Sequence, residues 1–373
     1  MRRQVALALA LAGCAPPAGD DPLAVGRRYV ADPAVGRAAL EASIVDSTND
    51  YSRLRLESYD AWATLPEPAR RVAWVTPGQA PSDWFTLPAD LPADPDAVRD
   101  QGELAFRAWP VQVDSALEAA LDDPATAAAA GLPTDAAGRL PLIWVQGPTG
   151  PLLAYTCATC HRLDGAATFD ERALHTGRPS QGAGRLDVTA DGLDNPTTIT
   201  DLRPVRRQTH LHRAATLHNS LLGLAVRIET LLITSAREQH RPPRAIAFAL
   251  AWYLWTLADA QPPVPGGPGA DVFARTCGGC HAGPDLAGPP VPLDALAPLS
   301  PAARAIGASP DRGTGTWRVP SLRGVGTRRP LLASGEVPDL DALLDPTRGG
   351  PHPFGQMLAA DDRATLLAWL RRL

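Results

Sequence analysis

Apolar positions along the chain gather into a few runs of helical length, separated by long stretches rich in proline and glycine. The run Ala245–Leu257 is apolar almost all round, which is typical of a helix buried inside a core. It is shorter than the ~20 residues that a helix needs to cross a bilayer. Apolar periodicity also predicts helices over Leu217–Ser235, over Asp361–Arg372 and near Asp114–Leu121. We therefore expect a mainly α protein with long irregular loops.

The beginning of the chain has the pattern of an export signal. Two arginines follow Met1, and the apolar segment Val5–Ala12 comes next. A basic start and a short apolar stretch are typical of a secretory signal peptide. The ending Leu11-Ala12-Gly13-Cys14 resembles the bacterial lipobox, in which the cysteine sulfur is acylated; a plain signal peptide with a chance cysteine is the alternative. We expect an exported protein that Cys14 anchors at the periplasmic side of a bacterial membrane, and Ala15 favours the outer membrane.

The composition excludes one class of partner and accounts for every cysteine. The chain of 373 residues carries 40 acidic and 35 basic side chains, so its net charge of −5 gives no basic footprint for binding nucleic acid. This length is comfortable for two domains. The five cysteines are Cys14 and two pairs of identical spacing, so none remains for a disulfide.

Both cysteine pairs belong to the pattern Cys-x-x-Cys-His. The first is Cys157-Ala158-Thr159-Cys160-His161, and the second is Cys277-Gly278-Gly279-Cys280-His281. Cysteines three positions apart lie on one face of a helical turn, so both sulfurs can reach the two vinyl groups on one edge of a porphyrin. The histidine that follows can then bind the iron. We expect two covalently bound haem c groups, with His161 and His281 as proximal iron ligands.

Two other kinds of site share this cysteine spacing. Paired zinc sites have about 15–20 residues between their pairs, far fewer than separate Cys160 from Cys277. A thioredoxin-like redox pair needs a βαβ context, which the pattern does not indicate. Two identical motifs behind an export signal favour haem over both. Phe273, four residues before Cys277 on an expected helix, would lie on the same face and pack on the second haem.

The segment after the second motif resembles a known family. Arg318–Val325 is similar to the motif that follows the second haem of bacterial dihaem cytochrome c peroxidases and their MauG relatives. It continues without a gap into Pro330–Val337, and Asn195-Pro196-Thr197 is similar to a segment of the family's first domain. The resemblance implies two cytochrome c-like helical domains with a haem in each.

The same resemblance implies roles for further residues. Arg323 would pair with a haem propionate, and calcium could lie between the domains near Asn195 and Pro320. The chain also departs from the family, because a family histidine aligns with Ala333 and the methionine that binds the second iron aligns with Thr347.

The sixth position on each iron therefore has several candidates. Met357 precedes the final helix, as the methionine ligand of class I cytochromes does, and is the first candidate for the second iron. His352 is its rival. His175 is the candidate for the first iron, because the peroxidase family carries a distal histidine at a comparable remove. Three other histidines compete with it: His210, His212 and His218.

These motifs divide the chain into a signal peptide (1–13), a tether (14–50), an N-terminal extension (51–149) and two haem c domains (150–261 and 270–373). The expected function is electron transfer between periplasmic redox proteins or other cytochromes, with the membrane as a partner through the lipid anchor. The alternative is a dihaem peroxidase, which needs an open iron and an acid–base side chain such as Glu171 or Glu229. A haem sensor or assembly factor is a third hypothesis.

Overall fold

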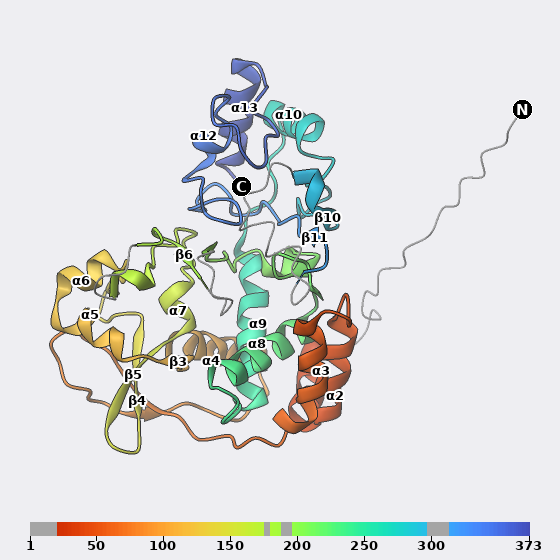
Figure 1. Ribbon diagram of the computed structural model, residues 1–373. Coiled ribbons are helices and arrows are strands. Elements are labelled where there is room, and N and C mark those ends of the chain that lie inside the picture. The colour runs from red at the N-terminus through yellow and green to blue at the C-terminus, as the bar shows by residue number, and fades with distance from the viewer. Residues whose placement is uncertain (1–20, 175–179, 188–195, 297–312) are drawn as a thin grey trace, which may run out of the picture.

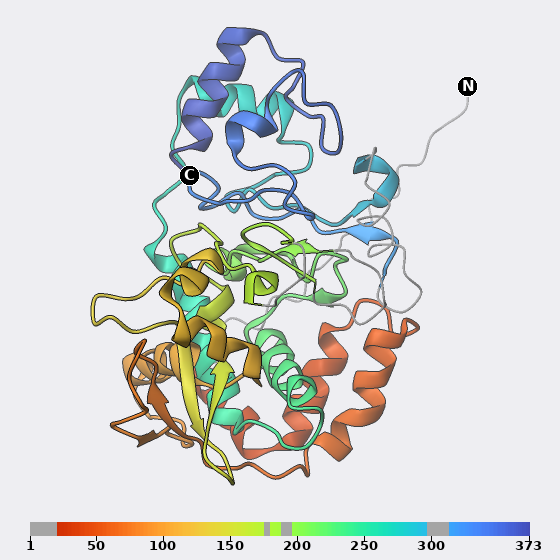
Figure 2. The same cartoon turned by 60° about the vertical axis from the view of Figure 1, so that its left-hand side comes forward.

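The computed structural model describes residues 21–174, 180–187, 196–296 and 313–373. Within these residues the protein is mainly helical, with short strands and long irregular loops. The described residues from 21 to 261 form a larger lobe, and the chain then passes from the end of helix α9 into a smaller C-terminal lobe, made of the described residues from 262 to 373 (Figure 1). A second view shows the smaller lobe stacked on one end of the larger one (Figure 2).

Helices α8 (Leu221–Ser235) and α9 (Arg244–Thr256) pack together in the larger lobe. As the apolar run predicted, α9 is buried continuously from Arg244 to Ala251. The helix expected from Leu217 begins later, because Ser220 caps α8 by accepting the Gly223 backbone N–H at 3.0 Å. Among the described residues, no helix has both the length and the apolar character needed to span a membrane.

Four N-terminal helices surround this pair: α1 (Pro22–Ala31), α2 (Pro33–Ser43), α3 (Asp50–Trp62) and α4 (Pro95–Ala108). Each is capped by an Asp or Asn side chain that accepts a backbone N–H, and three have proline in the first turn, where no N–H partner is needed. The expected tether over 14–50 is therefore wrong from residue 21 onward. Helix α1 packs on α9 and α2 packs on α8, so tertiary contacts stabilise helices too short to form alone.

A five-stranded antiparallel sheet leads the chain into the first Cys-x-x-Cys-His motif. Its strands are β1 (Arg71–Trp74), β2 (Phe85–Thr86), β3 (Gln112–Val113), β4 (Leu142–Gln146) and β5 (Pro151–Tyr155), in the order β2-β1-β4-β5-β3. Strands β4 and β5 pair across residue 150, so the expected extension and first domain share one sheet. The sequence did not predict this sheet, because strands of two to five residues give little periodicity.

Short elements complete the larger lobe. Its brief helices and 3₁₀ turns are η1 (Ser115–Leu117), α5 (Glu118–Asp122), α6 (Pro124–Ala129), α7 (Cys157–Cys160), η2 (Glu171–Leu174), η3 (Val205–Arg207) and η4 (Leu257–Ala260). Its two-residue strand pairs are β6 (Arg185–Leu186) with β7 (Thr197–Thr198) and β8 (His210–Leu211) with β9 (Leu217–His218). The helix expected near Asp114 is divided into η1 and α5, and Asp114 is its N-cap as predicted, accepting the Ala116 N–H at 2.9 Å.

The C-terminal lobe is built on two packed helices, α10 (Pro268–Thr276) and α13 (Ala360–Leu370). The ring centres of Phe273 on α10 and Trp369 on α13 lie 4.8 Å apart. The remaining elements are β10 (Val291–Pro292), η5 (Leu293–Leu296), β11 (Thr316–Trp317) and α12 (Leu340–Leu343). The final helix is thus confirmed, although it ends two residues earlier than expected.

Helices α4 and α9 approach so closely that Gly102 has no room for a side chain. A Cβ at this position would lie 2.0 Å from the carbonyl oxygen of Ala249. We expect Gly102→Ala to lower the free energy of unfolding by about 1–3 kcal/mol, because the two helices must separate. Urea unfolding measures this change. Gly266→Ala is the control, since a Cβ there meets nothing within 4 Å, and should change stability by less than about 0.5 kcal/mol; equal losses in both variants would contradict the prediction.

Candidate functional site

The second Cys-x-x-Cys-His motif continues the helical turn of α10. The backbone N–H of Cys277 donates to Phe273 O at 2.7 Å, and that of His281 donates to Cys277 O at 2.9 Å. His281 Nδ1 lies 3.1 Å from Pro320 O and 3.2 Å from Leu286 O. Because a carbonyl oxygen only accepts hydrogen bonds, Nδ1 carries the hydrogen and donates it, and the lone pair on Nε2 is left to bind a metal.

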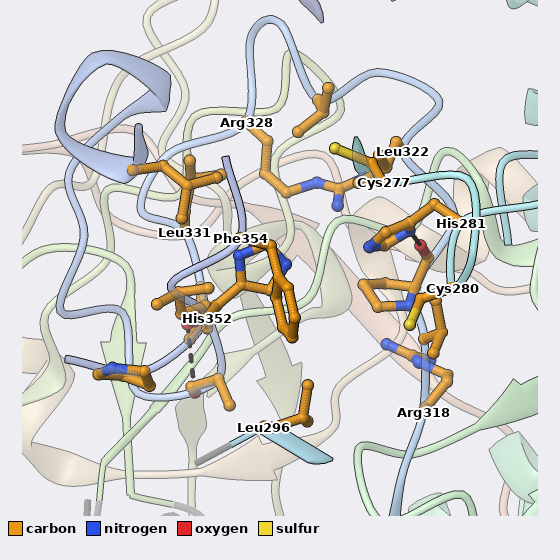
Figure 3. Close-up of a pocket in the computed structure, with 18 of the residues that line it drawn as sticks. Cys277, Cys280, His281, Leu296, Arg318, Leu322, Arg328, Leu331, His352 and Phe354 are labelled. Atoms are coloured by element: carbon orange, nitrogen blue, oxygen red, sulfur yellow. Dashed lines mark hydrogen bonds between the residues drawn. The ribbon is translucent and has the colours of Figure 1, made fainter. Parts of the chain in front are cut away.

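A cavity of about 430 Å³ lies against this motif (Figure 3). Cys277, Cys280 and His281 line it, together with apolar side chains that include Phe273 and Trp317. Burial raises the pKa of Cys277 to about 11 and lowers the pKa of His281 to about 4. The thiol therefore stays protonated and the imidazole stays neutral, with the lone pair that a metal requires. Phe273 stands where it would contact a flat ring bound in the cavity.

Three arginines supply positive charge to the wall of this cavity: Arg213, Arg318 and Arg328. Burial lowers the pKa of Arg213 to about 9 and that of Arg318 to about 10. Guanidinium groups pair well with carboxylates, including those of a propionate. The expectation that Arg323 has this role is not supported by the structure. Arg323 is absent from the wall and instead donates to Pro262 O at 2.7 Å, which ties down the segment between the lobes.

The structure separates the two candidates for the sixth position at this site. Met357 is 92% exposed and does not line the cavity, so the expectation that it binds the second iron is wrong in this arrangement. A thioether that points into water cannot bind a metal inside the lobe. His352 does line the cavity, and its ring centre lies 6.4 Å from that of His281.

The first motif follows directly from strand β5. Thr156 ends the extended segment and caps the single turn of α7. The backbone N–H of His161 donates to Cys157 O at 2.9 Å, and His161 Nδ1 lies 2.9 Å from Thr200 O. The histidine is therefore held by a backbone carbonyl, as at the second motif. Burial raises the pKa of both cysteine thiols of this motif to about 12.

A second cavity, of about 380 Å³, lies beside His161. Its wall mixes rings with charged side chains, among them Trp74, Glu103, Arg107 and Tyr253. Apart from His161, no histidine, methionine or cysteine of the described residues lines it. His175, expected as the ligand of the first iron, lies outside the described residues.

A buried ion pair begins beside the carbonyl that holds His161. The residue after Thr200 is Asp201, whose side chain is 3% exposed. Asp201 pairs with Arg203 at 2.8 Å and with Arg328 of the C-terminal lobe at 3.4 Å. Burial alone would raise the pKa of Asp201, but the hydrogen bond from Arg203 and the charges of both arginines outweigh it, and the pKa is lowered.

The same ion pair reaches the segment that holds the second histidine. Arg328 donates to Ser321 O at 3.3 Å, and Ser321 directly follows Pro320, the residue whose carbonyl faces His281. Two short backbone segments, one for each motif histidine, are therefore joined through Asp201 and Arg328. Nothing in the sequence indicated this link, because the two residues are 127 positions apart.

The two carboxylates considered for acid–base chemistry lie in different surroundings. Glu229 lines neither cavity and accepts hydrogen bonds from Tyr29 and Tyr59, each at 2.8 Å, inside the larger lobe. Its role is therefore structural, in contrast to the expectation. Glu171, on η2, lies near the first motif, where its charge contributes to the raised pKa of Cys160.

The remaining candidates lie away from both cavities or outside the described residues. His210 and His218 form a cross-strand pair with ring centres 4.8 Å apart, and His212 is half-buried near Tyr51. None of the three lines either cavity. Cys14 and Asn195 lie outside the described residues. Within those residues, no group of three or more His, Cys, Asp or Glu side chains could hold a metal ion such as calcium.

A solved structure resembles this chain over most of its length. It is described as the crystal structure of a MauG-like protein associated with microbial copper homeostasis. The two chains share 17% identity with a TM-score of 0.41, and the match covers 80% of this chain and 93% of that one. No family model matches the sequence. No curated protein matches it either.

Proposed function

We propose that this chain is an exported dihaem c-type cytochrome that transfers electrons between periplasmic redox partners. The observation that carries the proposal is the repeated geometry of the two Cys-x-x-Cys-His motifs. In each, a helical turn precedes a histidine whose Nδ1 is held by a backbone carbonyl; His281 is buried and His161 is half-buried. This second contact fixes the tautomer and the direction of a metal-binding imidazole. Zinc bound jointly by the four cysteines would leave both oriented histidines unexplained.

Each part of the chain has a defined role in this proposal. The cysteines of each motif would hold one haem through thioether bonds, with His161 and His281 as iron ligands. Bound there, haem supplies an iron that gains and loses one electron. The apolar wall of the larger cavity, at the second motif, would exclude water, and the arginines along it would offset the charge of the propionates. We further propose that Cys14 anchors the protein to the membrane surface.

One observation at the first motif favours the alternative function, a dihaem peroxidase. Apart from His161, the cavity beside the first motif has no histidine, methionine or cysteine of the described residues in its wall, and Glu171 carries negative charge close to this motif. An open iron with a carboxylate nearby is the arrangement that peroxide chemistry requires. Turnover of peroxide with a reduced cytochrome as donor, together with a high-spin iron, would favour this alternative over a simple relay.

Counting haems per chain tests the proposal. Protein secreted by a host with cytochrome c maturation should give two haems per chain in a pyridine haemochrome assay. Loss of one motif, in Cys157→Ala/Cys160→Ala or in Cys277→Ala/Cys280→Ala, should leave one, because each motif holds its own group.

Cys14→Ser is the control for these variants. It should keep two haems but leave the membrane fraction, since it removes only the acylation site. Colourless wild-type protein, with its four motif thiols bound to zinc or oxidised to disulfides, would overturn the proposed function.

A further inference from the structure

The loop of residues 348–356 closes one side of the larger cavity. This loop brings His352 and Phe354 into the wall opposite the second motif (Figure 3). We propose that His352 is the second axial ligand of the iron at this site, so that His281 and His352 form a bis-imidazole pair. This inference rests on the proposed function, because it needs a haem in the cavity.

The separation of the two rings is the first observation behind the proposal. Their centres lie 6.4 Å apart. Metal–imidazole bonds measure about 2.0–2.1 Å and a ring nitrogen lies about 1 Å from its ring centre, so two imidazoles on one metal have centres about 6 Å apart. The angle of 59° between the ring planes is compatible, because two axial rings can rotate independently about the axis they share.

The environment of the His352 side chain is the second observation behind the proposal. The side chain is half-buried, and its Nδ1 atom is buried without a hydrogen-bond partner among the described atoms. A buried polar atom without a partner costs about 1–3 kcal/mol, so such atoms call for a reason. The other acidic groups in the wall do not compete, because Asp201 is paired with Arg203 and Arg328 and Glu336 is exposed. Met357 points into water.

The backbone of the loop is arranged to present this one side chain. His352 has a φ of +57°, a conformation uncommon outside glycine, and Gly349 and Gly350 before it also have positive φ. Arg348 donates to Pro351 O at 2.9 Å and to His352 O at 3.1 Å, which pins the loop. The ring of Phe354 packs edge-on against His352 at 5.3 Å between centres. Unusual backbone held in place by neighbours is typical of functional positions.

A bis-imidazole pair has two consequences for this site. Both axial positions are filled, so cyanide or carbon monoxide cannot bind without displacing a histidine. A second imidazole also gives the iron a lower potential than a methionine ligand would. The haem at the second motif would then only relay electrons. Any reaction with a small molecule would take place at the haem of the first motif.

Substitution of His352 tests this assignment. Purified His352→Ala should keep two haems per chain, but the electron paramagnetic resonance and visible spectra of the ferric protein should gain one high-spin iron relative to wild type. Added imidazole should restore the low-spin signal, since it can occupy the vacated position. Met357→Ala is the matched control and should leave every spectrum unchanged.

A second measurement keeps the test decisive if His352→Ala does not fold. Near-infrared magnetic circular dichroism of the wild type distinguishes bis-imidazole from imidazole–methionine coordination, and His352→Met should raise the midpoint potential of one haem only. Two haems with an unchanged spectrum in His352→Ala, or methionine coordination in the wild type, would overturn the inference while leaving the proposed function intact. Absence of haem from the wild type would instead overturn the proposed function.

Discussion

Replacing Glu229 with glutamine is expected to lower the free energy of unfolding by about 3 kcal/mol or more. Glu229 is 1% exposed on α8 and accepts hydrogen bonds from Tyr29 of α1 and Tyr59 of α3, each at 2.8 Å. It also pairs with Arg244 of α9 at 3.2 Å. Without the negative charge, the buried Arg244 guanidinium loses its counter-ion, and the cost is the desolvation that Glu229 now offsets.

The expected result is a large loss of stability that originates in the N-terminal helices. Burial, followed by the charge of Glu229, raises the pKa of both tyrosines, so their hydroxyls stay protonated and remain donors at physiological pH. Denaturant unfolding followed by circular dichroism measures the loss, and limited proteolysis should show earlier cleavage within residues 21–62. Glu41→Gln, on α2, removes an exposed ion pair with Arg37 and is the control, with an expected change of less than about 1 kcal/mol. Similar stability in both variants would contradict the prediction.

Replacing Asp201 with asparagine should affect both lobes at once. The variant leaves Arg328 buried between the lobes without a counter-ion, so we expect a loss of about 3 kcal/mol or more. The carbonyl groups that hold His161 and His281 flank this ion pair, so the positions of these carbonyl groups should shift as well. In haem-loaded protein, the midpoint potentials of both haems should change relative to the wild type, because the partners of each proximal imidazole are disturbed.

The effect of Asp201→Asn should also depend on pH. The folded protein lowers the pKa of Asp201, so its ionised form contributes stability above the unfolded value of about 3.9. That contribution is lost as the pH falls through the lower, folded pKa. The stability difference between wild type and Asp201→Asn should therefore be full at neutral pH and shrink below about pH 4. Urea unfolding at several pH values measures it.

A matched variant distinguishes a specific link between the two haem sites through Asp201 from a general weakening of the contact between the lobes. Arg207 of the larger lobe pairs with Asp285 of the smaller one at 2.7 Å, and both side chains are partly exposed. Arg207→Gln should weaken the contact between the lobes slightly and leave the potential of the first haem unchanged. Equal shifts of both potentials in Arg207→Gln and Asp201→Asn would contradict a specific role for Asp201.

Some of the failed expectations share one cause, which is that burial cannot be read from local pattern. Met357 stands before the final helix, as a methionine ligand does in class I cytochromes, yet it is 92% exposed. Arg323 stands in the family-like motif, yet it donates to Pro262 O between the lobes. Both residues are at plausible positions along the chain, but their side chains point away from the cavity.

The sequence by itself determined what depends on neighbours within about one helical turn. The buried helix α9, the N-cap at Asp114 and the two Cys-x-x-Cys-His turns follow from spacings of three or four residues. The tertiary structure alone decided which distant groups meet. It brought Asp201 to Arg328, 127 positions apart, and placed His352 rather than Met357 opposite His281. Local spacing fixes the direction of a side chain within its own turn, whereas burial and charge pairing depend on how the whole chain packs.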